Sequence, residues 1–553
     1  MAFIRVQKLV RDSNGNILSG SAAIKESQYI KDGSKFHSRQ IVRERLGKVV
    51  WLASDGKSGI FLSPSRGLVS YNSVSDSFDE VSRDDERLSG GSVDVFPDTE
   101  IHTVFGDAHL LFCFLVKSGM AEVLKIAFPD EIERERVLCH ILHSILRDGS
   151  RISCDNFIEK SFASYVLDDV PTASLRCDTA YFNMMGKDSV RLAFFKAFVE
   201  RMRKTNPNFG KCCYVDSSPL PNDIDNNPFN ALSCHGIDSS SVQTRLVLVL
   251  DEETGFPVWY DIIPGNVLDI NIIMTVMNDV AVSLDITINS LVLDAGYISK
   301  EVIHAFHNGT EKSLIGRMPA RKGFPFKTLY HEFKSSLDKG KYRFVRGCHV
   351  YFGKRKEIEL FGEKIFAYVY VDKHNALQRE RTYMLDHPEE YAALKDKEKD
   401  WMSVRFGYFV LLSNKKLKPV DLLTEHFGRT DIEGVIKTSK EYLGLLPLAK
   451  WSADTVRGKI LSDIMNTIIF LNMRKALDES GLSVSEVTGK TQSLMCFRNK
   501  HGEILIETPN KKVKAYYKLI GETIPASLKI KDFRRKVMLS VIVVLLLALS
   551  KAQ

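Results

Sequence analysis

The sequence predicts an α/β protein whose central part is a mixed sheet. Short runs rich in β-branched residues read as strands in the middle of the chain, at 211–216 (KCCYVD), 245–251 (RLVLVLD), 257–263 (PVWYDII) and 288–294 (INSLVLD). Residues 270–282, between the last two runs, carry apolar residues at helical spacing. Strands interrupted by a helix in this way are typical of a mixed α/β sheet.

The length of 553 residues corresponds to several domains, at roughly 100–200 residues per domain. With 44% hydrophobic and 26% charged residues, the composition is that of an ordinary globular protein. We predict an N-terminal β-rich region, a helical region, a central core in two segments, a β-rich insertion within it, and a basic C-terminal region. Their bounds are 1–100, 101–208, 209–319 with 411–476, 320–410, and 477–553.

The first two regions differ in pattern. Residues 1–100 read as short strands separated by turns, and Asp76–Gly91 is an acidic stretch that we interpret as a linker or loop. In the second region, Glu131–Leu146 and Val190–Met202 have helical spacing. This helical region is a candidate DNA-binding region of the helix-turn-helix kind, and plain helical packing is the alternative.

Positive charge is concentrated in two blocks. Residues 312–356 hold 13 Lys and Arg against 2 Asp and Glu, and residues 434–553 hold 20 against 10. Such blocks indicate a polyphosphate ligand, although a solvated basic surface explains them as well. In the first block, aromatic residues lie among the basic ones, close to predicted strands at 342–345, 349–352 and 364–371. Aromatic rings can stack on bases; the alternative is that they form the small core of a β domain.

The cysteines and the C-terminal segment indicate the compartment of the protein and its relation to membranes. Nine cysteines without a CxxC pair favour a reducing compartment and argue against a zinc site. No signal peptide is visible at the N-terminus. Val537–Leu549 is almost wholly apolar, but it is shorter than the roughly 20 residues of a membrane span. We expect it to form a buried C-terminal helix with no membrane partner; an exposed tail that promotes association is the alternative.

Three acidic residues stand out as candidates for chemistry. Asp216 and Asp294 each come at the end of a predicted strand, and ligands of open α/β sheets bind at that edge. A third, Glu433, lies in a predicted helix at 417–442, which is followed by another at 452–475. In the first helix Arg429, Glu433, Lys437 and Lys440 follow each other at spacings of four, four and three, which places them along one face. The alternative is a solvated stripe of charges, and a lone strand-end Asp more often begins a turn.

These motifs resemble those of the DDE transposases of bacterial insertion sequences. Residues 426–440 (HFGRTDIEGVIKTSK) match their Tyr-x₂-Arg-x₃-Glu-x₆-Lys signature at Arg429, Glu433 and Lys440. The segments VDSSPLPND and LVLDAGYIS are similar to the motifs of the first and second catalytic Asp, and together the similar segments span residues 210–475. The long insertion before the Glu resembles the IS-four superfamily branch. Two departures are His426 in place of the signature Tyr, and Ala-Gly-Tyr after Asp294, where many relatives carry an Arg.

The resemblance implies a ribonuclease-H-like catalytic core in which Asp216, Asp294 and Glu433 are both the catalytic residues and the metal ligands. It implies two Mg²⁺ ions, with Mn²⁺ as the possible substitute. The DNA-binding residues would be Arg429, Lys440, Lys437 and His426. The reaction would cut the ends of the insertion sequence and join them to target DNA.

The resemblance also implies the partners and the cellular setting. The partners would be the element ends and the target DNA, bound by a homodimer in the synaptic complex, in the bacterial cytoplasm at the nucleoid. The insertion at 320–370 is a candidate for handling the DNA strand end, with Phe324 and Tyr330 as residues to test. Two alternatives stay open: a catalytically silent DNA-binding derivative, and another nuclease of the same fold.

Overall fold

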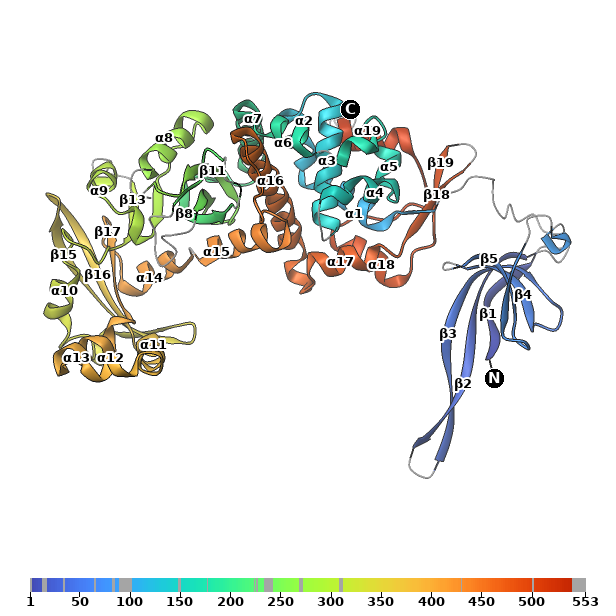
Figure 1. Cartoon of the computed structure of the whole chain (residues 1–553), viewed down its shortest axis with the longest axis horizontal. Coiled ribbons are helices and arrows are strands. Elements are labelled where there is room, and N and C mark those ends of the chain that lie inside the picture. The colour runs from blue at the N-terminus through green and yellow to red at the C-terminus, as the bar shows by residue number, and fades with distance from the viewer. Residues whose placement is uncertain are drawn as a thin grey trace, which may run out of the picture. The chain divides into compact units, whose positions relative to one another are not determined.

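The computed structural model describes most of the chain and divides it into two compact units, Met1–Ile101 and His102–Gln553 (Figure 1). The described residues are 2–11, 17–32, 35–63, 66–81, 85–88, 102–147, 151–176, 178–222, 224, 227–232, 242–267, 272–307, 312–428, 430–499 and 502–539.

The first unit is a six-stranded antiparallel sheet in which each strand pairs with the next along the chain. The strands are β1 (Ala2–Arg11), β2 (Ile17–Asp32), β3 (Lys35–Leu52), β4 (Ser58–Ser63), β5 (Gly67–Asn72) and β6 (Ser77–Glu80). A small apolar core forms around Ile24, Val49 and Phe61, which are fully buried. The strands predicted here are present, but β2 and β3 reach 16 and 18 residues and are not short. Part of the predicted linker Asp76–Gly91 is strand β6.

The second unit is built on a ten-stranded mixed sheet, with β9 paired to β10 beside the path β11-β10-β8-β12-β13-β17-β16-β15-β14 (Figure 1). The strands of its first half are β8 (Cys212–Pro221), β9 (Ala231–Leu232), β10 (Val242–Asp251), β11 (Pro257–Pro264), β12 (Ser290–Leu293) and β13 (Ser313–Arg317). Here β8, β10 and β11 are antiparallel, whereas β12 and β13 run parallel to β8. Helix α8 (Ile273–Leu284) leads from β11 to β12, and helix α9 (Lys300–His307) leads from β12 to β13.

The predicted β insertion at 320–410 contains helices as well as strands. Its strands β14 (Arg343–Arg346), β15 (His349–Leu360) and β16 (Glu363–Asp372) continue the central sheet through β17 (Tyr408–Ser413). Its helices are α10 (Phe326–Phe333), α11 (Lys373–Asp386), α12 (Pro388–Ala393) and α13 (Asp396–Arg405). The helices at 373–405 were not predicted, although this stretch is rich in Lys, Glu, Ala and Leu, which are good helix formers.

Residues before and after the central sheet form one helical body. It contains α1 (Gly106–Ser118), α2 (Met120–Ala127), α3 (Glu131–Leu146), α4 (Cys154–Glu159), α5 (Ala163–Val166), α6 (Asp178–Met185), α7 (Asp188–Arg203), α16 (Ala453–Leu477), α17 (Val484–Thr491), α18 (Lys511–Leu519) and α19 (Ile530–Leu539). A four-stranded sheet ties its two parts together, because β18 (Met495–Arg498) pairs with β7 (Thr103–Val104) as well as with β19 (Glu503–Ile506), which pairs with β20 (Ser527–Lys529). The C-terminal residues therefore pack back onto the predicted helical region.

Glycines allow the long helix α16 to pack closely against α6. A Cβ on Gly458 would lie 1.8 Å from the carbonyl oxygen of Phe182, and one on Gly186 would lie 2.0 Å from that of Asp454. Neither position therefore accommodates a side chain without a backbone shift. This contact holds α16 against the N-terminal helices.

The C-terminal apolar segment is only partly described. Val537 and Met538, the first residues of the predicted helix Val537–Leu549, are buried at the end of α19. Residues 540–553 lie outside the described part of the chain. Within that part, no helix combines the length and the hydropathy that crossing a membrane requires.

Candidate functional site

The carboxylates of Asp216 and Asp294 belong to neighbouring parallel strands in matching register. Val215 on β8 pairs with Leu293, the last residue of β12, and Asp216 and Asp294 each follow one of these paired residues. Side chains at matching positions of adjacent strands point to the same face of a sheet. Both residues are half-buried, and Asp216 Oδ1 accepts a hydrogen bond of 2.8 Å from the Ser217 amide.

The two residues differ in their position along their strands. Asp294 directly follows the last residue of β12, as predicted, and precedes a single 3₁₀ turn at Ala295–Tyr297. Asp216 does not end its strand, because β8 continues to Pro221 through its pairing with β10. The prediction of a strand end at Asp216 was therefore wrong. The parallel neighbour β12 pairs with β8 only as far as Val215, so the edge of parallel pairing still lies at Asp216.

The last turn of helix α14 (Pro419–Gly428) lies against the face of β8 on which Asp216 lies. Tyr214, two residues before Asp216, points to the same face as Asp216. Its hydroxyl donates to the main-chain carbonyl of Glu425 over 3.4 Å. A Cβ on Gly428 would come within 2.1 Å of that hydroxyl, so the end of α14 approaches β8 closely because residue 428 is a glycine.

Glu433 lies in α15 (Thr430–Lys437), a helix that packs against β8. The three predicted carboxylate residues thus come from β8, the end of β12 and a helix against β8. The side chain of Glu433 and the whole of Arg429 lie outside the described residues. In place of one predicted helix at 417–442 there are α14, α15 and a π-helical turn at Thr438–Tyr442.

Lys440 is attached to strand β8. Its Nζ donates a hydrogen bond of 2.7 Å to the carbonyl oxygen of Pro219. Burial lowers the pKa of Lys440 from its ordinary value. The π-helical turn that carries Lys440 has a different pitch from an α-helix, so the four-residue spacing of one α-helical face does not extend through Lys440.

The other two predicted DNA-binding residues lie in different surroundings. Lys437 is exposed at the end of α15. His426 is only 5% exposed in the last turn of α14, with its ring 5.7 Å from that of Phe427. Because so little of the His426 ring reaches solvent, its position favours a role in holding α14 over direct contact with a phosphate.

Arg245 is a residue near the site that the sequence reasoning missed. It lies on β10 opposite Pro219, is 6% exposed, and donates from its guanidinium to the Ser217 hydroxyl, next to Asp216. By the register of β10 and β8, the Arg245 side chain lies on the sheet face that Ser217 and Pro219 share, where it places fixed positive charge one residue away from Asp216 along the strand. A signal was present in the sequence, since Arg245 opens an otherwise apolar strand (RLVLVLD).

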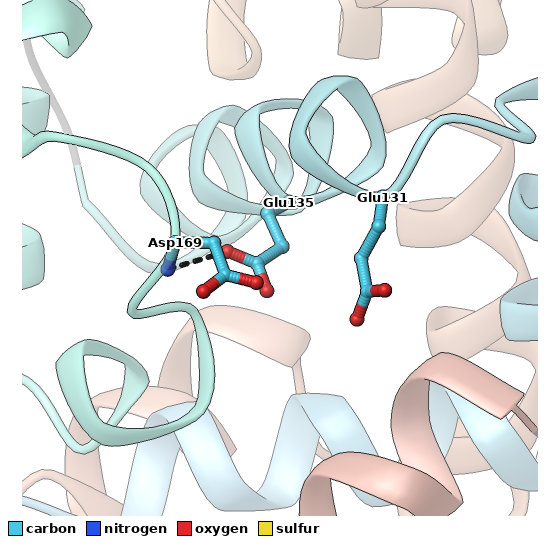
Figure 2. Close-up of side chains that lie close together, drawn as sticks. All are labelled: Glu131, Glu135 and Asp169. Atoms are coloured by element: carbon cyan, nitrogen blue, oxygen red, sulfur yellow. Dashed lines mark hydrogen bonds between the residues drawn. The ribbon is translucent and has the colours of Figure 1, made fainter.

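A second group of acidic side chains lies elsewhere in the helical body (Figure 2). Glu131 and Glu135 of α3 and Asp169, after α5, bring one carboxylate oxygen each within 4.8 Å of one another. The Asp169 amide donates to Glu135 Oε2 over 3.1 Å. Arg534 of α19 binds this group: its Nη2 donates to Glu135 at 2.6 Å and to Glu131 at 3.4 Å, and its guanidinium also pairs with Asp168 and Asp169.

Arg534 gives this acidic group a structural explanation. The carboxylates already have a cationic partner, and Glu135 is fully buried beneath it. Burial raises the pKa of Glu135 to about 7, although the nearby Arg534 acts in the opposite direction. The ion pairs fix α19 to α3, and we do not assign this group to the candidate active site.

Comparison with known protein families agrees with the position of the site. Residues 215–448 match the family model described as "Transposase DDE domain". This span begins one residue before Asp216 and contains Asp294, Glu433 and Lys440. The central part of the chain is therefore a transposase DDE domain, and the prediction that the chain is a transposase enzyme is confirmed.

The whole chain was also compared with curated proteins and with solved structures. The search of curated proteins found no relative. Among solved structures, the chain is similar to a cryo-EM structure of the piggyBac transposase synaptic complex with hairpin DNA. The sequence identity is 10%, the TM-score is 0.37, and the match covers 78% of this chain and 85% of that chain.

Proposed function

We propose that the protein is a DNA transposase that cleaves the ends of its insertion sequence and joins them to target DNA. The observation that carries the proposal is the register of β8 and β12, which sets Asp216 and Asp294 side by side within a transposase DDE domain. We further propose that the core is ribonuclease-H-like. The strand order β11-β10-β8-β12-β13, with three antiparallel strands followed by two parallel ones, supports this.

The donor set suits a hard divalent cation. Asp216 and Asp294 supply carboxylate oxygens on one face of the sheet, and Glu433 would supply a third from α15. Two Mg²⁺ ions, or Mn²⁺ in their place, would activate the attacking oxygen and stabilise the leaving oxygen at phosphorus. The role of this chain's residues is to fix the carboxylates, with Arg245 and Ser217 holding the strand around Asp216.

The basic residues of α15 and of the turn after it complete the proposed site. We propose that Arg429, Lys437 and Lys440 contact phosphates near the cut end, and that His426 positions α14 and with it the helix that follows. The bond from Lys440 to Pro219 supports this, because it joins the basic segment to the strand of Asp216. The His-Arg-Glu-Lys pattern at 426–440 and the long insertion favour the IS-four branch.

The partners follow from the proposed reaction. The protein would bind the element ends and target DNA, as a homodimer in which each active site acts on one end, in the bacterial cytoplasm at the nucleoid. The catalytically silent derivative and a different nuclease of the same fold are the competing proposals. The side-by-side carboxylates disfavour the first of these.

A cleavage assay tests the proposal. Full-length protein is incubated with DNA that carries the element's own ends, with and without Mg²⁺, beside the variants Asp294→Asn and Glu433→Gln. We expect metal-dependent cleavage and strand transfer by the wild type alone, with end binding retained by both variants. Binding without cleavage by the wild type would favour the silent derivative, and cleavage without strand transfer would favour another nuclease.

A further inference from the structure

A basic groove lies at the edge of the central sheet, away from the carboxylates. Its volume is about 500 Å³, within the range of roughly 300–1,000 Å³ that is common for ligand pockets. The β14–β15 hairpin and the first residues of α14 line it. Five cationic side chains line this groove: Lys341, Arg343, Lys354, Arg355 and Lys418. No carboxylate does so among the described residues.

Two of the five cations are held in place by the protein. The ammonium of Lys354 lies 4.4 Å from the ring centroid of Phe333 and 5.4 Å from that of Tyr342. Arg355 Nη1 donates a hydrogen bond of 2.6 Å to the carbonyl oxygen of Leu417, directly before α14. These contacts reduce the rotamer freedom that the two side chains would lose when they bind an anion.

The other three cations are exposed and free of acidic partners. Lys341, Arg343 and Lys418 are all exposed, and none forms an ion pair with a carboxylate in the described part of the chain. The contrast with neighbouring lysines is informative, since Lys356 pairs with Glu332 and Lys373 pairs with Asp338. The carboxylates of Glu332 and Asp338 thus pair with lysines outside the groove and not with the cations that line it. Repulsion among like charges within it is relieved when a polyanion binds.

A free strand edge and the start of a helix lie next to the groove. Strand β14 is the last strand of the sheet, so one of its edges carries main-chain groups that no described strand pairs with. Pro419 is the first residue of α14, a helix of ten residues, and the start of a helix carries partial positive charge. The partial positive charge at the start of α14 thus adds to the charge of the five cations, and both favour a phosphate.

We propose that this groove binds the phosphodiester backbone of DNA at a distance from the bond that is cut. The inference rests on the proposed function, which it extends by a second DNA-binding site on the same chain. Helix α14 links the two sites, since its first residues line the groove and its last turn contacts Tyr214 beside Asp216. The helix that borders the groove therefore also reaches the strand that carries Asp216.

Salt-dependent binding of two matched triple variants tests the inference. The groove variant is Lys341→Gln, Arg343→Gln, Lys418→Gln; the control is Lys327→Gln, Lys334→Gln, Lys397→Gln, which removes three exposed lysines of the same insertion outside the groove. Both are made in the full chain with Asp294→Asn, so that binding is measured without cleavage. The probes are a fluorescein-labelled duplex with the element's end and a duplex of unrelated sequence.

We expect the slope of log K against log salt to fall by about 0.9 for each lost phosphate contact, hence by about 2.7 in the groove variant. The control variant should change the slope by less than one contact. A smaller slope for the groove variant supports the inference. If only the duplex with the element's end shows it, the groove holds that end; if both duplexes show it, the groove binds DNA of any sequence. Equal losses in the groove and control variants would overturn the inference.

A cross-linking measurement gives a second readout that does not depend on charge. The duplexes carry an azidophenacyl group on single backbone phosphorothioates, and the peptides that cross-link on irradiation are identified by mass spectrometry. We expect a cross-link at Tyr342 or Phe344, the aromatic residues that line the groove. Cross-links confined to other segments would contradict the proposal. If the wild type nevertheless cleaves element ends in a metal-dependent way, only the proposal for the groove is wrong. If the wild type neither binds nor cleaves DNA, the proposed function itself is wrong.

Discussion

Lys440 binds the main chain of β8 at Pro219, three residues beyond Asp216, through a hydrogen bond of 2.7 Å. The contact spans more than two hundred residues of sequence and brings the basic segment after α15 to the strand of the first carboxylate. The bond makes Lys440 part of the structure of the site as well as a candidate for phosphate contact.

We predict that Lys440→Met lowers the free energy of unfolding by about 1 kcal/mol, because the hydrogen bond from Lys440 Nζ to the carbonyl of the exposed residue Pro219 is lost. Lys416→Met is the matched control, since Lys416 is also an exposed lysine and forms no ion pair with a carboxylate in the described part of the chain. Its effect on stability should stay within about 0.5 kcal/mol. Denaturant unfolding of both variants measures the difference, and equal stabilities would show that the bond to Pro219 contributes nothing.

The two groups of acidic residues should respond differently to mutation. Asp216→Asn removes a proposed metal ligand, and we expect metal-dependent end cleavage to fall by more than about 100-fold, beyond the usual effect of losing an outer-shell partner. Glu131→Gln should leave the cleavage rate within about twofold, because its group is already bound by Arg534. The readout is the initial rate of end cleavage at saturating Mg²⁺. A comparable loss in Glu131→Gln would move the metal site to the group of Figure 2.

Glu135 should make stability depend on pH in a defined direction. Burial raises the pKa of Glu135 from 4.5 to about 7, so between these values the folded state binds more protons than the unfolded state. The free energy of unfolding then falls as pH rises through this window and levels off above it. We expect Glu135→Gln to remove this part of the slope. Denaturant midpoints measured from pH 4.5 to pH 7 test this, and an unchanged slope in the variant would assign it to other groups.

Two helical glycines form a matched pair for testing the packing of α16. Gly458→Ala would set a Cβ 1.8 Å from the carbonyl oxygen of Phe182, and we expect it to destabilise the fold by about 2 kcal/mol or more. Gly489→Ala in α17 meets nothing within 4 Å and should stabilise the protein by about 0.8 kcal/mol through helix propensity. Thermal unfolding of the two variants gives the comparison. A neutral Gly458→Ala would mean that α6 and α16 separate at little cost.

The strands that carry the carboxylates were predictable from sequence, because buried strands of β-branched residues leave a clear local pattern. The extension of β8 beyond Asp216 was not, since Pro219 and Pro221 argue against a strand interior. The structure shows why proline is tolerated there. Past Val215, β8 pairs with β10 on one side but no longer with β12 on the other, so the prolines lie where one edge of the strand needs no donors.

The aromatic residues of the insertion show the opposite limit. Phe324 and Tyr330 were predicted candidates for contact with a DNA end, but both are packed against other aromatic rings. Tyr330 is 9% exposed, with its ring 4.6 Å from that of Trp401, and Phe324 lies 5.5 Å from Phe361. Trp401 follows Tyr330 by about seventy residues, so no local pattern could reveal this core.

The position of β17 in the sheet has a consequence for engineering the protein. This strand pairs with β13 of the core through Leu411–Ser413 and with β16 of the insertion along its whole length. The insertion is thus part of the central sheet and not a separate domain on a flexible linker. Deleting it, or exchanging it for that of another protein, would leave β17 with an unpaired edge that invites aggregation. A functional chimera would have to supply a replacement strand in the register of β16. The hydrogen-bonded strands of the sheet would then fix its DNA-contacting surface relative to the carboxylates.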